Sequence, residues 1–323
     1  MSLRVTYRDA KTYPEYSSLW RPVSTCTESG RLMSRTQLNL FEDSRHNAID
    51  KAVEEDFWAY HAGMADGDGC VRIQKSRNDS FNYALELVDK NIVEELSSLY
   101  GVTLSVRDPK KSKRKDRFTI KRQKSYYVNL CGQNAIHFIQ KIYPYMIEKR
   151  RIVESIAKLK KFNLNKFKVH QGAMLYWLAG YFDAEGSIVF NHKAYIKAKK
   201  TYGTTVALRW VTTDYKVARY VRKLTNRLFR GKSHKPVVTI SKNSKNRKKP
   251  IYAVVMGQAI KIFIFGKVFK DIIKIKRKQD KFLKLIDYGN FCAKYKFKFG
   301  KVDFAKNKNR RDKWLEGMKS EME

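Results

Sequence analysis

A nine-residue pattern occurs twice in this chain, and the duplication limits what the chain can fold into. Residues 61–69 read HAGMADGDG, and residues 178–186 read LAGYFDAEG. Each copy has an Ala-Gly pair, then Asp66 or Asp183, then an acid directly before a final glycine. The spacing between the copies is too long for a solenoid repeat and is typical of a duplicated domain.

The residues after each pattern predict the same order of elements in both copies. Alternating runs predict strands, and longer apolar runs predict helices, one of which ends at Gly101. The last helix of each copy is predicted to be long, over residues 133–162 and 258–286. We therefore predict an α+β protein made of two pseudo-twofold-related αββαββα repeats. The expected strands that follow the two patterns directly are 70–75, 82–88, 188–195 and 204–212.

The repeat also divides the chain into expected domains. We expect an N-terminal extension over 1–50, a first repeat over 51–162, a linker over 163–171, a second repeat over 172–288 and a basic C-terminal extension over 289–323. The C-terminal extension fits two alternatives equally well, an arm that adds phosphate contacts and a solvated tail.

The charge of the chain indicates a polyanionic partner. Lys and Arg number 68 against 31 acidic residues, which gives a formal net charge of +37. Such a charge repels itself unless it faces nucleic acid or an anionic membrane. No apolar run approaches the roughly 18 residues of a membrane-spanning helix, and the N-terminal residues lack the apolar core of a secretory signal. We expect an intracellular protein with a nucleic-acid partner and no membrane, in the cytoplasm of a phage or bacterial host or in an organelle matrix.

The first part of each pattern predicts a helix that packs closely against another helix. Its apolar and small residues do not keep to one stripe, which is typical of a buried helix. The pairs Ala62-Gly63 and Ala179-Gly180 leave little side chain on one face, so another backbone can approach. In a duplicated protein the natural partner is the other copy's Ala-Gly face, across a pseudo-twofold axis. The alternative is that each helix packs only within its own half.

The acid before each final glycine needs a nearby cation. Gly69 and Gly186 are expected to end the helices as C′ residues, which places Asp68 and Glu185 at the negative end of the helix dipole. If the two helices pair and end together, these carboxylates converge. Converging carboxylates are usual ligands of Mg²⁺. Beside a phosphodiester, such ions activate water and stabilise the leaving oxygen.

Asp66 and Asp183 also recur between the two copies. We expect them to hold the helix ends by hydrogen bonds; the alternative is a second pair of metal ligands. The aromatic residues Tyr60 and Trp177 occupy equivalent positions, three places before the helix glycines.

The two patterns resemble the paired signature of the LAGLIDADG homing endonucleases in their double-motif, single-chain form. The second copy keeps Leu-Ala-Gly and ends in Asp-Ala-Glu-Gly, whereas the first has His61 for Leu and Gly67 for Ala. The resemblance covers about residues 50–288. It implies a magnesium-dependent, site-specific endonuclease that acts as a monomer. Such an enzyme cuts both strands of a long asymmetric DNA site across the minor groove and leaves short 3′ overhangs.

The resemblance also implies roles for the parts of the chain. Each half would lay a curved antiparallel four-stranded sheet in the DNA major groove, so that the two sheets form a saddle. The metal ligands would be Asp68 and Glu185, together with the residues before them, Gly67 and Ala184. Two or three divalent ions would lie near the scissile phosphates, normally Mg²⁺, with Mn²⁺ or Ca²⁺ as substitutes.

The family places a lysine near the active site in each half, on the last helix after an apolar stretch. The segments YPYMIEKRR and DIIKIKRKQ match that pattern and indicate Lys149 and Lys276. Such a lysine could stabilise the transition state or tune the attacking water. Arg150, Lys274 and Lys278 are close alternatives.

Basic and polar residues on the strands and hairpins are the expected DNA contacts. Basic runs at 110–115 and 242–249 fall in the same hairpin of each copy, where a tip would meet phosphates. Base contacts are expected from one face of the strands, because Arg pairs well with guanine and Asn or Gln with adenine. The candidate residues are Arg72, Gln74, Lys75, Asn82, Lys193 and Arg209 on strands, and Lys110, Lys111, Lys113, Arg114, Lys245, Arg247 and Lys248 on hairpins.

Two alternatives to a nuclease remain on the same scaffold. One is a maturase that binds intron RNA, and the other is a DNA-binding regulator that does not cleave. Loss of an acid is expected in a protein that no longer cleaves. Both acids are present here, which favours the enzyme.

Overall fold

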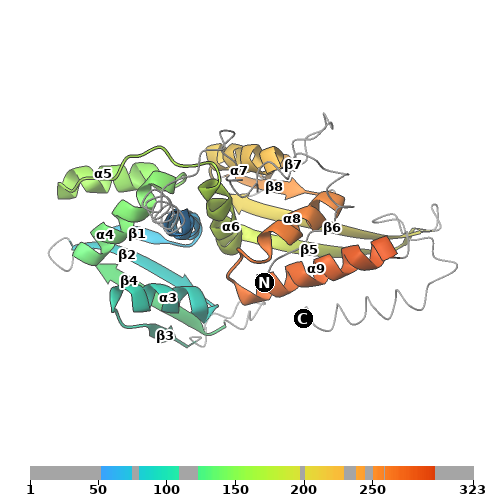
Figure 1. The fold of residues 1–323 in the computed structure, drawn as a ribbon, viewed down its shortest axis with the longest axis horizontal. Coiled ribbons are helices and arrows are strands. Elements are labelled where there is room, and N and C mark those ends of the chain that lie inside the picture. Colours follow the sequence, from blue (N-terminus) through green and yellow to red (C-terminus); the bar gives the residue numbers. More distant parts are fainter. Residues whose placement is uncertain are drawn as a thin grey trace, which may run out of the picture.

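Two halves of the same topology make up the molecule. The computed structural model describes residues 52–74, 80–108, 123–196, 201–228, 238–243, 250–257 and 259–294. Within them, each half has a four-stranded antiparallel sheet with helices packed against it. Figure 1 shows the halves side by side, with one helix from each half between the two sheets.

The first half begins with the helix of residues 52–67, which we call the first motif helix. It continues through β1 (Cys70–Gln74), β2 (Ser80–Leu87), α3 (Lys90–Tyr100), β3 (Ser105–Arg107), β4 (Ser125–Cys131), α4 (Gln133–Ile142) and α5 (Arg150–Lys160). The strand order is β1-β2-β4-β3. On the central strand, Phe81, Tyr83 and Leu85 alternate toward the helices and are buried. The predicted end of α3 is confirmed, because Gly101 has a left-handed backbone with φ of 59°.

The second half repeats this plan. Its elements are α6 (Ala173–Glu185), β5 (Gly186–Ile196), β6 (Thr201–Thr212), α7 (Tyr215–Leu228), β7 (Val238–Asn243), β8 (Ile251–Met256), α8 (Ala259–Phe269) and α9 (Lys276–Lys294). The strand order β5-β6-β8-β7 matches that of the first half. Trp210 on β6 packs against Phe182 of α6 and Phe265 of α8, which joins the sheet to its helices. The predicted α+β class with two αββαββα repeats is confirmed.

The prediction of one long last helix in each half is wrong. In the first half the chain leaves α4 for a 3₁₀ turn at residues 143–145 and then starts α5. Pro144 accounts for part of this break, because it has no amide hydrogen to donate within a helix. In the second half α8 stops at Phe269 and α9 starts at Lys276 without any proline between them.

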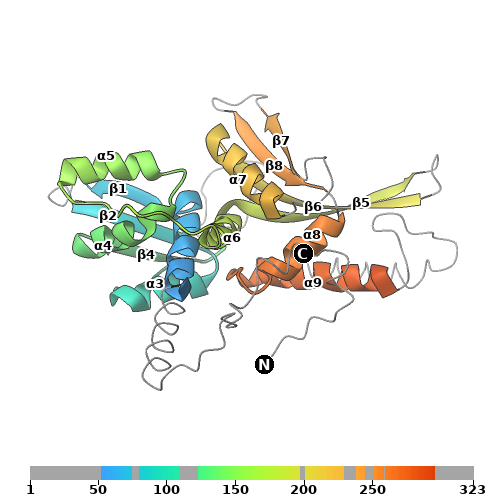
Figure 2. The same cartoon turned by 45° about the horizontal axis from the view of Figure 1, so that its top comes forward.

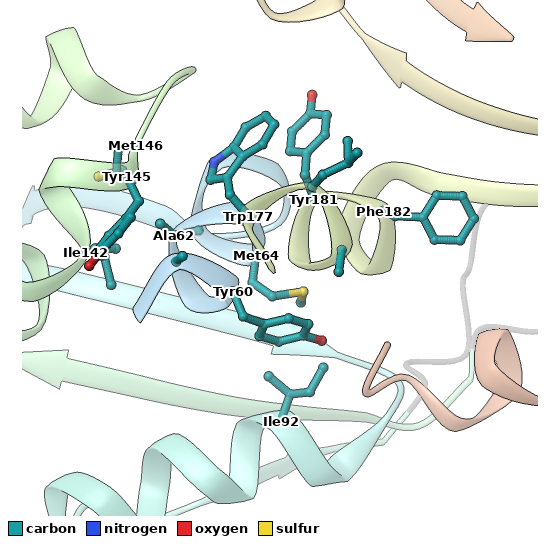
Figure 3. Packing of buried hydrophobic residues seen from close by; sticks show 14 of the residues in the cluster. Tyr60, Ala62, Met64, Ile92, Ile142, Tyr145, Met146, Trp177, Tyr181 and Phe182 are labelled. Atoms are coloured by element: carbon teal, nitrogen blue, oxygen red, sulfur yellow. The ribbon is translucent and has the colours of Figure 1, made fainter. Parts of the chain in front are cut away.

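The motif helices approach each other backbone to backbone. A Cβ atom on Gly63 would collide with the carbonyl oxygen of Trp177 and lie 2.6 Å from the Tyr181 nitrogen. A Cβ atom on Gly180 would collide with the carbonyl oxygen of Tyr60 and lie 3.1 Å from the Met64 nitrogen. Ala62 and Ala179 beside them are fully buried. Figure 3 shows Trp177 on one side of the helix pair and Tyr60 and Met64 on the other.

The final glycine of each pattern follows its helix, but not as a left-handed C′ residue. Gly186 has extended backbone with φ of −86°, and Gly69 is not among the described glycines with positive φ. A Cβ atom on Gly69 would lie 2.7 Å from the Ala65 carbonyl oxygen, and one on Gly186 would lie 2.5 Å from Cγ of Phe182. Glycine is therefore required at both positions for space rather than for backbone conformation.

Candidate active site

The two motif helices end at the same place. A Cβ atom on Gly67 would collide with Cβ of Ala184 and lie 3.2 Å from Cγ of Glu185. The residue directly before Asp68 therefore touches the acid of the other half. This arrangement brings Asp68 and Glu185 together at the junction, along with Gly67 and Ala184, the residues before them.

The electrostatics of the two acids reflect this convergence. Burial raises the pKa of the half-buried Glu185, and the negative charges of Asp68 and Glu148 raise it further. Asp68 is exposed, yet the protein around it displaces part of its solvent shell, and this raises the pKa of its carboxyl group. The positive charges of Lys278 and Lys149 act in the opposite direction on both acids.

The side chain of Lys149, one of the expected site residues, reaches the end of the first motif helix. Its Nζ donates hydrogen bonds to the carbonyl oxygens of Ala65 at 2.7 Å, Gly67 at 2.8 Å and Gly69 at 2.6 Å. The last carbonyls of a helix lack intrahelical partners, and a cation is favourable there. Burial lowers the pKa of Lys149.

In the second half this place is taken by Lys278 instead of Lys276. Nζ of Lys278 donates to the carbonyl oxygens of Phe182 at 2.8 Å and Asp183 at 2.6 Å. Its side chain is buried, and this burial lowers its pKa to about 8. Lys276 is exposed on the first turn of α9, where its Nζ lies 3.0 Å from Asp280. The placement expected of Lys276 was therefore wrong by two positions, a shift that turns a side chain to another face of a helix.

Asp66 and Asp183 form hydrogen bonds that cross between the halves. Asp66 Oδ2 accepts from Nε1 of Trp177 at 2.9 Å, and Asp183 Oδ2 accepts from the hydroxyl of Tyr60 at 2.5 Å. Trp177 and Tyr60 are equivalent positions, so the two bonds are related by the pseudo-twofold axis. Burial raises the pKa of both carboxyl groups.

The same two aspartates hold the segment that interrupts the last helix of each half. Asp66 accepts the amide hydrogens of Ile147 at 2.7 Å and Lys149 at 2.9 Å. Asp183 accepts those of Lys274 at 2.8 Å and Ile275 at 3.2 Å. These amides are bound to a side chain rather than to a helix, which explains the break where no proline occurs. The bonds also place Lys149 and Lys278 next to the motif helix ends.

One face of the first sheet presents polar side chains away from the helices. Arg72 on β1 is paired across the sheet with Asn82 on β2, and Nδ2 of Asn82 donates to Oε1 of Gln74 at 2.6 Å. These three residues were predicted to contact DNA, and the structure brings them together on one face. Asn82 is itself buried within the sheet.

Comparison with solved structures relates this geometry to known proteins. The LAGLIDADG meganuclease I-AabMI bound to uncleaved DNA matches with a TM-score of 0.52 and 14% identity, over 81% of this chain and 98% of that chain. The I-LtrWI LAGLIDADG homing endonuclease bound to target DNA matches with a TM-score of 0.51 and 10% identity, over 75% and 92%. The chain has the LAGLIDADG homing endonuclease fold. No family model and no curated protein matches the sequence.

In the LAGLIDADG fold of this chain, the second sheet has the same two faces. Leu208 and Trp210 on β6 are buried toward the helices, whereas Arg209 between them is exposed on the opposite face. The backbone of Lys193 pairs with Gly203 where β5 and β6 extend beyond their predicted ends. Several predicted contacts lie outside the described residues: Lys75, Lys110, Lys111, Lys113, Arg114, Lys245, Arg247 and Lys248.

Sequence reasoning missed several residues at these sites. Glu148 follows the 3₁₀ turn, and its Oε2 accepts the hydroxyl of Tyr181 in the other half at 2.8 Å. On the polar face of the first sheet, Glu86 accepts from Ser125 at 2.6 Å, and the guanidinium of Arg107 lies over the Tyr127 ring at 4.1 Å. Strand alternation from Asn82 to Glu86 was the available signal for that face. Glu148 could not be found, because its role depends on a contact between halves.

Within the described part of the chain, no cluster of three or more His, Cys, Asp or Glu side chains is arranged to bind a metal. Among the same residues, no helix combines the length and apolarity required to span a membrane.

Proposed function

We propose that this chain is a sequence-specific DNA endonuclease that cleaves both strands of a long asymmetric site with the help of divalent metal ions. The observation that carries the proposal is the meeting of Asp68 and Glu185 at the junction of two pseudo-symmetric halves. The polar faces of the two sheets and the net charge of +37 support a DNA partner. The I-AabMI and I-LtrWI structures of the same fold hold DNA.

The donor atoms at the junction fit a hard cation. Asp68 and Glu185 are oxygen donors from opposite halves, and the charge of Asp68 makes ionisation of Glu185 less favourable. A cation between them would remove that repulsion. Mg²⁺ prefers such carboxylate oxygens and keeps several waters. The carbonyl of Ala184 in the last turn of α6 is a further donor, whereas that of Gly67 already accepts from Lys149.

Each part of the chain has a distinct task in this mechanism. A bound divalent ion supplies an activated water and stabilises charge on the leaving oxygen. When ionised, the carboxylates of Asp68 and Glu185 would hold such ions. Lys149 and Lys278 fix the helix ends and add positive charge beside the acids. Arg72, Gln74 and Arg209 are proposed to contact bases from the sheet faces, because their side chains match the donors and acceptors of the major groove. Asn82 is buried and is proposed to position Gln74 through their hydrogen bond.

The finer assignments belong to the same proposal. We propose Mg²⁺ as the working ion, short 3′ overhangs as the products and a monomer as the active species, since one chain supplies both halves of the site. The convergence of both acids supports cleavage over a DNA-binding regulator. The maturase alternative would require an intron RNA partner.

Substitution of the two acids tests the proposal. Asp68→Asn and Glu185→Gln are each expected to lower double-strand cleavage by about a thousandfold or more, because each removes a charged metal ligand. Duplex affinity is expected to stay within about threefold, since binding depends mainly on phosphate contacts. Targets would be selected from a randomised library with the wild-type protein, and nicked and linear products would be separated on gels.

An exposed carboxylate outside the junction provides the control. Asp271→Asn removes an acid that, among the described residues, forms an ion pair with its neighbour Lys270, and wild-type cleavage is expected. Cleavage of both strands at the normal rate by Asp68→Asn or Glu185→Gln, in the presence of Mg²⁺, would refute the site.

A further inference from the structure

The outward face of α7 carries a concentration of positive charge that the proposed cleavage does not use. Its five basic residues are exposed, and the helix contains no acid: Lys216, Arg219, Arg222, Lys223 and Arg227. Four of them line a groove of about 540 Å³ along the helix. None of the five takes part in an ion pair within the described residues.

The fold does not require this charge. The equivalent helix of the first half, α3, covers its sheet in the same way but contains one lysine and two glutamates, Lys90, Glu94 and Glu95. Lys90 there is neutralised by Glu94 at 2.8 Å. Two helices of one duplicated design thus share their buried face and differ in their outward face. Packing of α7 on its sheet therefore does not need this charge.

This surface lies on the far side of the second sheet from the proposed DNA saddle. Val217, Val221 and Leu224 turn the buried side of α7 onto the sheet, next to β7 and β8 (Figure 2). Arg209 is exposed on the opposite face of that sheet. A duplex seated against Arg209 is separated from the outward face of α7 by the sheet and the helix itself. The α7 face is therefore available while the saddle is occupied.

The chemistry of the groove favours a regular array of phosphates over unpaired bases. Single-stranded nucleic acid is usually held by stacking on free aromatic rings. Tyr220 is half-buried with its ring 5.6 Å from that of Trp177, and the exposed ring of Tyr215 lies 5.2 Å from that of Tyr252. The cations from Lys216 to Arg227 span about 16 Å of helix. A duplex strand presents a phosphate for each ~3.4 Å along its axis, so four or five base pairs would match this span.

We propose that the outward face of α7 binds a second segment of double-stranded DNA through its phosphates, without sequence preference, while the saddle holds the first. The molecule then bridges two duplexes and can pass from one to the other during its search for a target. The proposal rests on the proposed function in one respect, because the first duplex is the one that the saddle would recognise.

A co-capture experiment tests bridging directly. The full-length protein is mixed, without divalent metal, with a fluorescent duplex that contains its selected target and a biotinylated duplex of unrelated sequence. Fluorescence retained on streptavidin reports protein molecules that hold both duplexes. The variant Arg219→Gln, Arg222→Gln, Lys223→Gln is expected to reduce co-capture about tenfold at 0.1 M salt. The magnitude of its log–log salt slope should fall by up to about 2.7, since each lost contact contributes roughly 0.9.

A matched variant separates the α7 face from net charge. Lys158→Gln, Lys166→Gln, Lys168→Gln removes the same number of exposed charges from α5 and the segment after it, and co-capture close to wild type is expected. Both variants should cleave an isolated target duplex within about twofold of the wild-type rate when Mg²⁺ is added. If the wild-type protein does not bridge two duplexes, or if the α7 variant and the matched variant lose co-capture equally, the proposal is wrong.

Two further arms distinguish the remaining outcomes. An RNA hairpin in place of the biotinylated duplex should be captured no better than DNA, and preferential capture of the RNA would overturn the assignment to DNA. If no cleaved target can be selected, two unrelated duplexes are used instead. Bridging that depends on Arg219, Arg222 and Lys223 would then uphold the α7 surface, even though the proposed cleavage would have failed.

Discussion

At the scale of single residues, the clearest feature is a lysine buried among carbonyl oxygens. Lys278 is held by Phe182 and Asp183 at the end of α6, and burial lowers its pKa to about 8. The unfolded chain keeps a lysine pKa near 10.5. The folded protein therefore releases the proton at a lower pH than the unfolded chain. The stability contributed by this group is complete above the unfolded pKa and is lost as pH falls through the folded pKa.

The variant Lys278→Met tests this relation. The free energy of unfolding of wild type, relative to Lys278→Met, should rise by about 2 kcal/mol between about pH 7 and pH 9.5, because only wild type has this proton to release. Urea unfolding at several pH values gives the difference directly. The control is Lys276→Met, which removes an exposed lysine two residues away. A flat difference for Lys278→Met would show that Lys278 is not buried as described.

At the scale of elements, the contact between the motif helices depends on two glycines. Gly63 and Gly180 each face the backbone of the opposite helix, and a single added carbon on either would collide with a carbonyl oxygen. Backbone cannot yield as the end of a flexible side chain can. The helices would have to separate, and their separation would also move Asp68 and Glu185 apart.

Adding one methyl group at either glycine should therefore strongly destabilise the folded protein. Gly63→Ala and Gly180→Ala are each expected to cost at least about 3 kcal/mol of stability, at the upper end of the range for overpacking. Gly257→Ala is the control, because a Cβ atom there has nothing within 4 Å and the backbone φ is not positive. Thermal unfolding should show a large decrease in Tm for the first two variants and no decrease for the third.

The repeated pattern carried most of the information on elements that could be predicted from sequence. The order of elements, the Ala-Gly contact and the end of α3 at Gly101 all depend on local spacing. The break in the last helix of the first half had a local signal in Pro144, but the break in the second half had none, since it is held by Asp183 far away in the chain. Lys276 was preferred to its close alternative Lys278 because the start of α9, which sets which residue faces α6, could not be read from the sequence.

At the scale of the whole molecule, polar contacts fasten the halves together beside the motif helices. Nζ of Lys274 donates to both oxygens of Glu95 on α3 at 2.8 Å, and it lies over the rings of Phe57 and Tyr60. His61 is one of the two residues that depart from the family pattern. Its Nε2 lies 3.2 Å from Oε2 of Glu95. The pKa of Glu95 falls to about 2 because His61 and Lys274 together outweigh the effect of burial.

A double-mutant cycle measures the coupling free energy between Glu95 and Lys274. Glu95→Gln and Lys274→Gln are expected to couple by about 1–2 kcal/mol, since the pair is partly buried and doubly hydrogen-bonded. The exposed pair Lys90 and Glu94, four residues apart on one helix, should couple by only about 0.3–0.5 kcal/mol. Both values come from urea unfolding of the single and double variants. Equal coupling in the two cycles would mean that Lys274 contributes no more than an ordinary surface charge.

The crossed bonds from Tyr60 to Asp183 and from Trp177 to Asp66 have a consequence for substitutions in either half. Each half donates a hydrogen bond to the buried carboxylate of the other, so a substitution at one of these positions affects both halves. Loss of the Tyr60 or Trp177 donor would remove one hydrogen bond from a buried aspartate of the opposite half. The two halves differ in the charge of their outer helices, whereas these reciprocal bonds are the same in both directions.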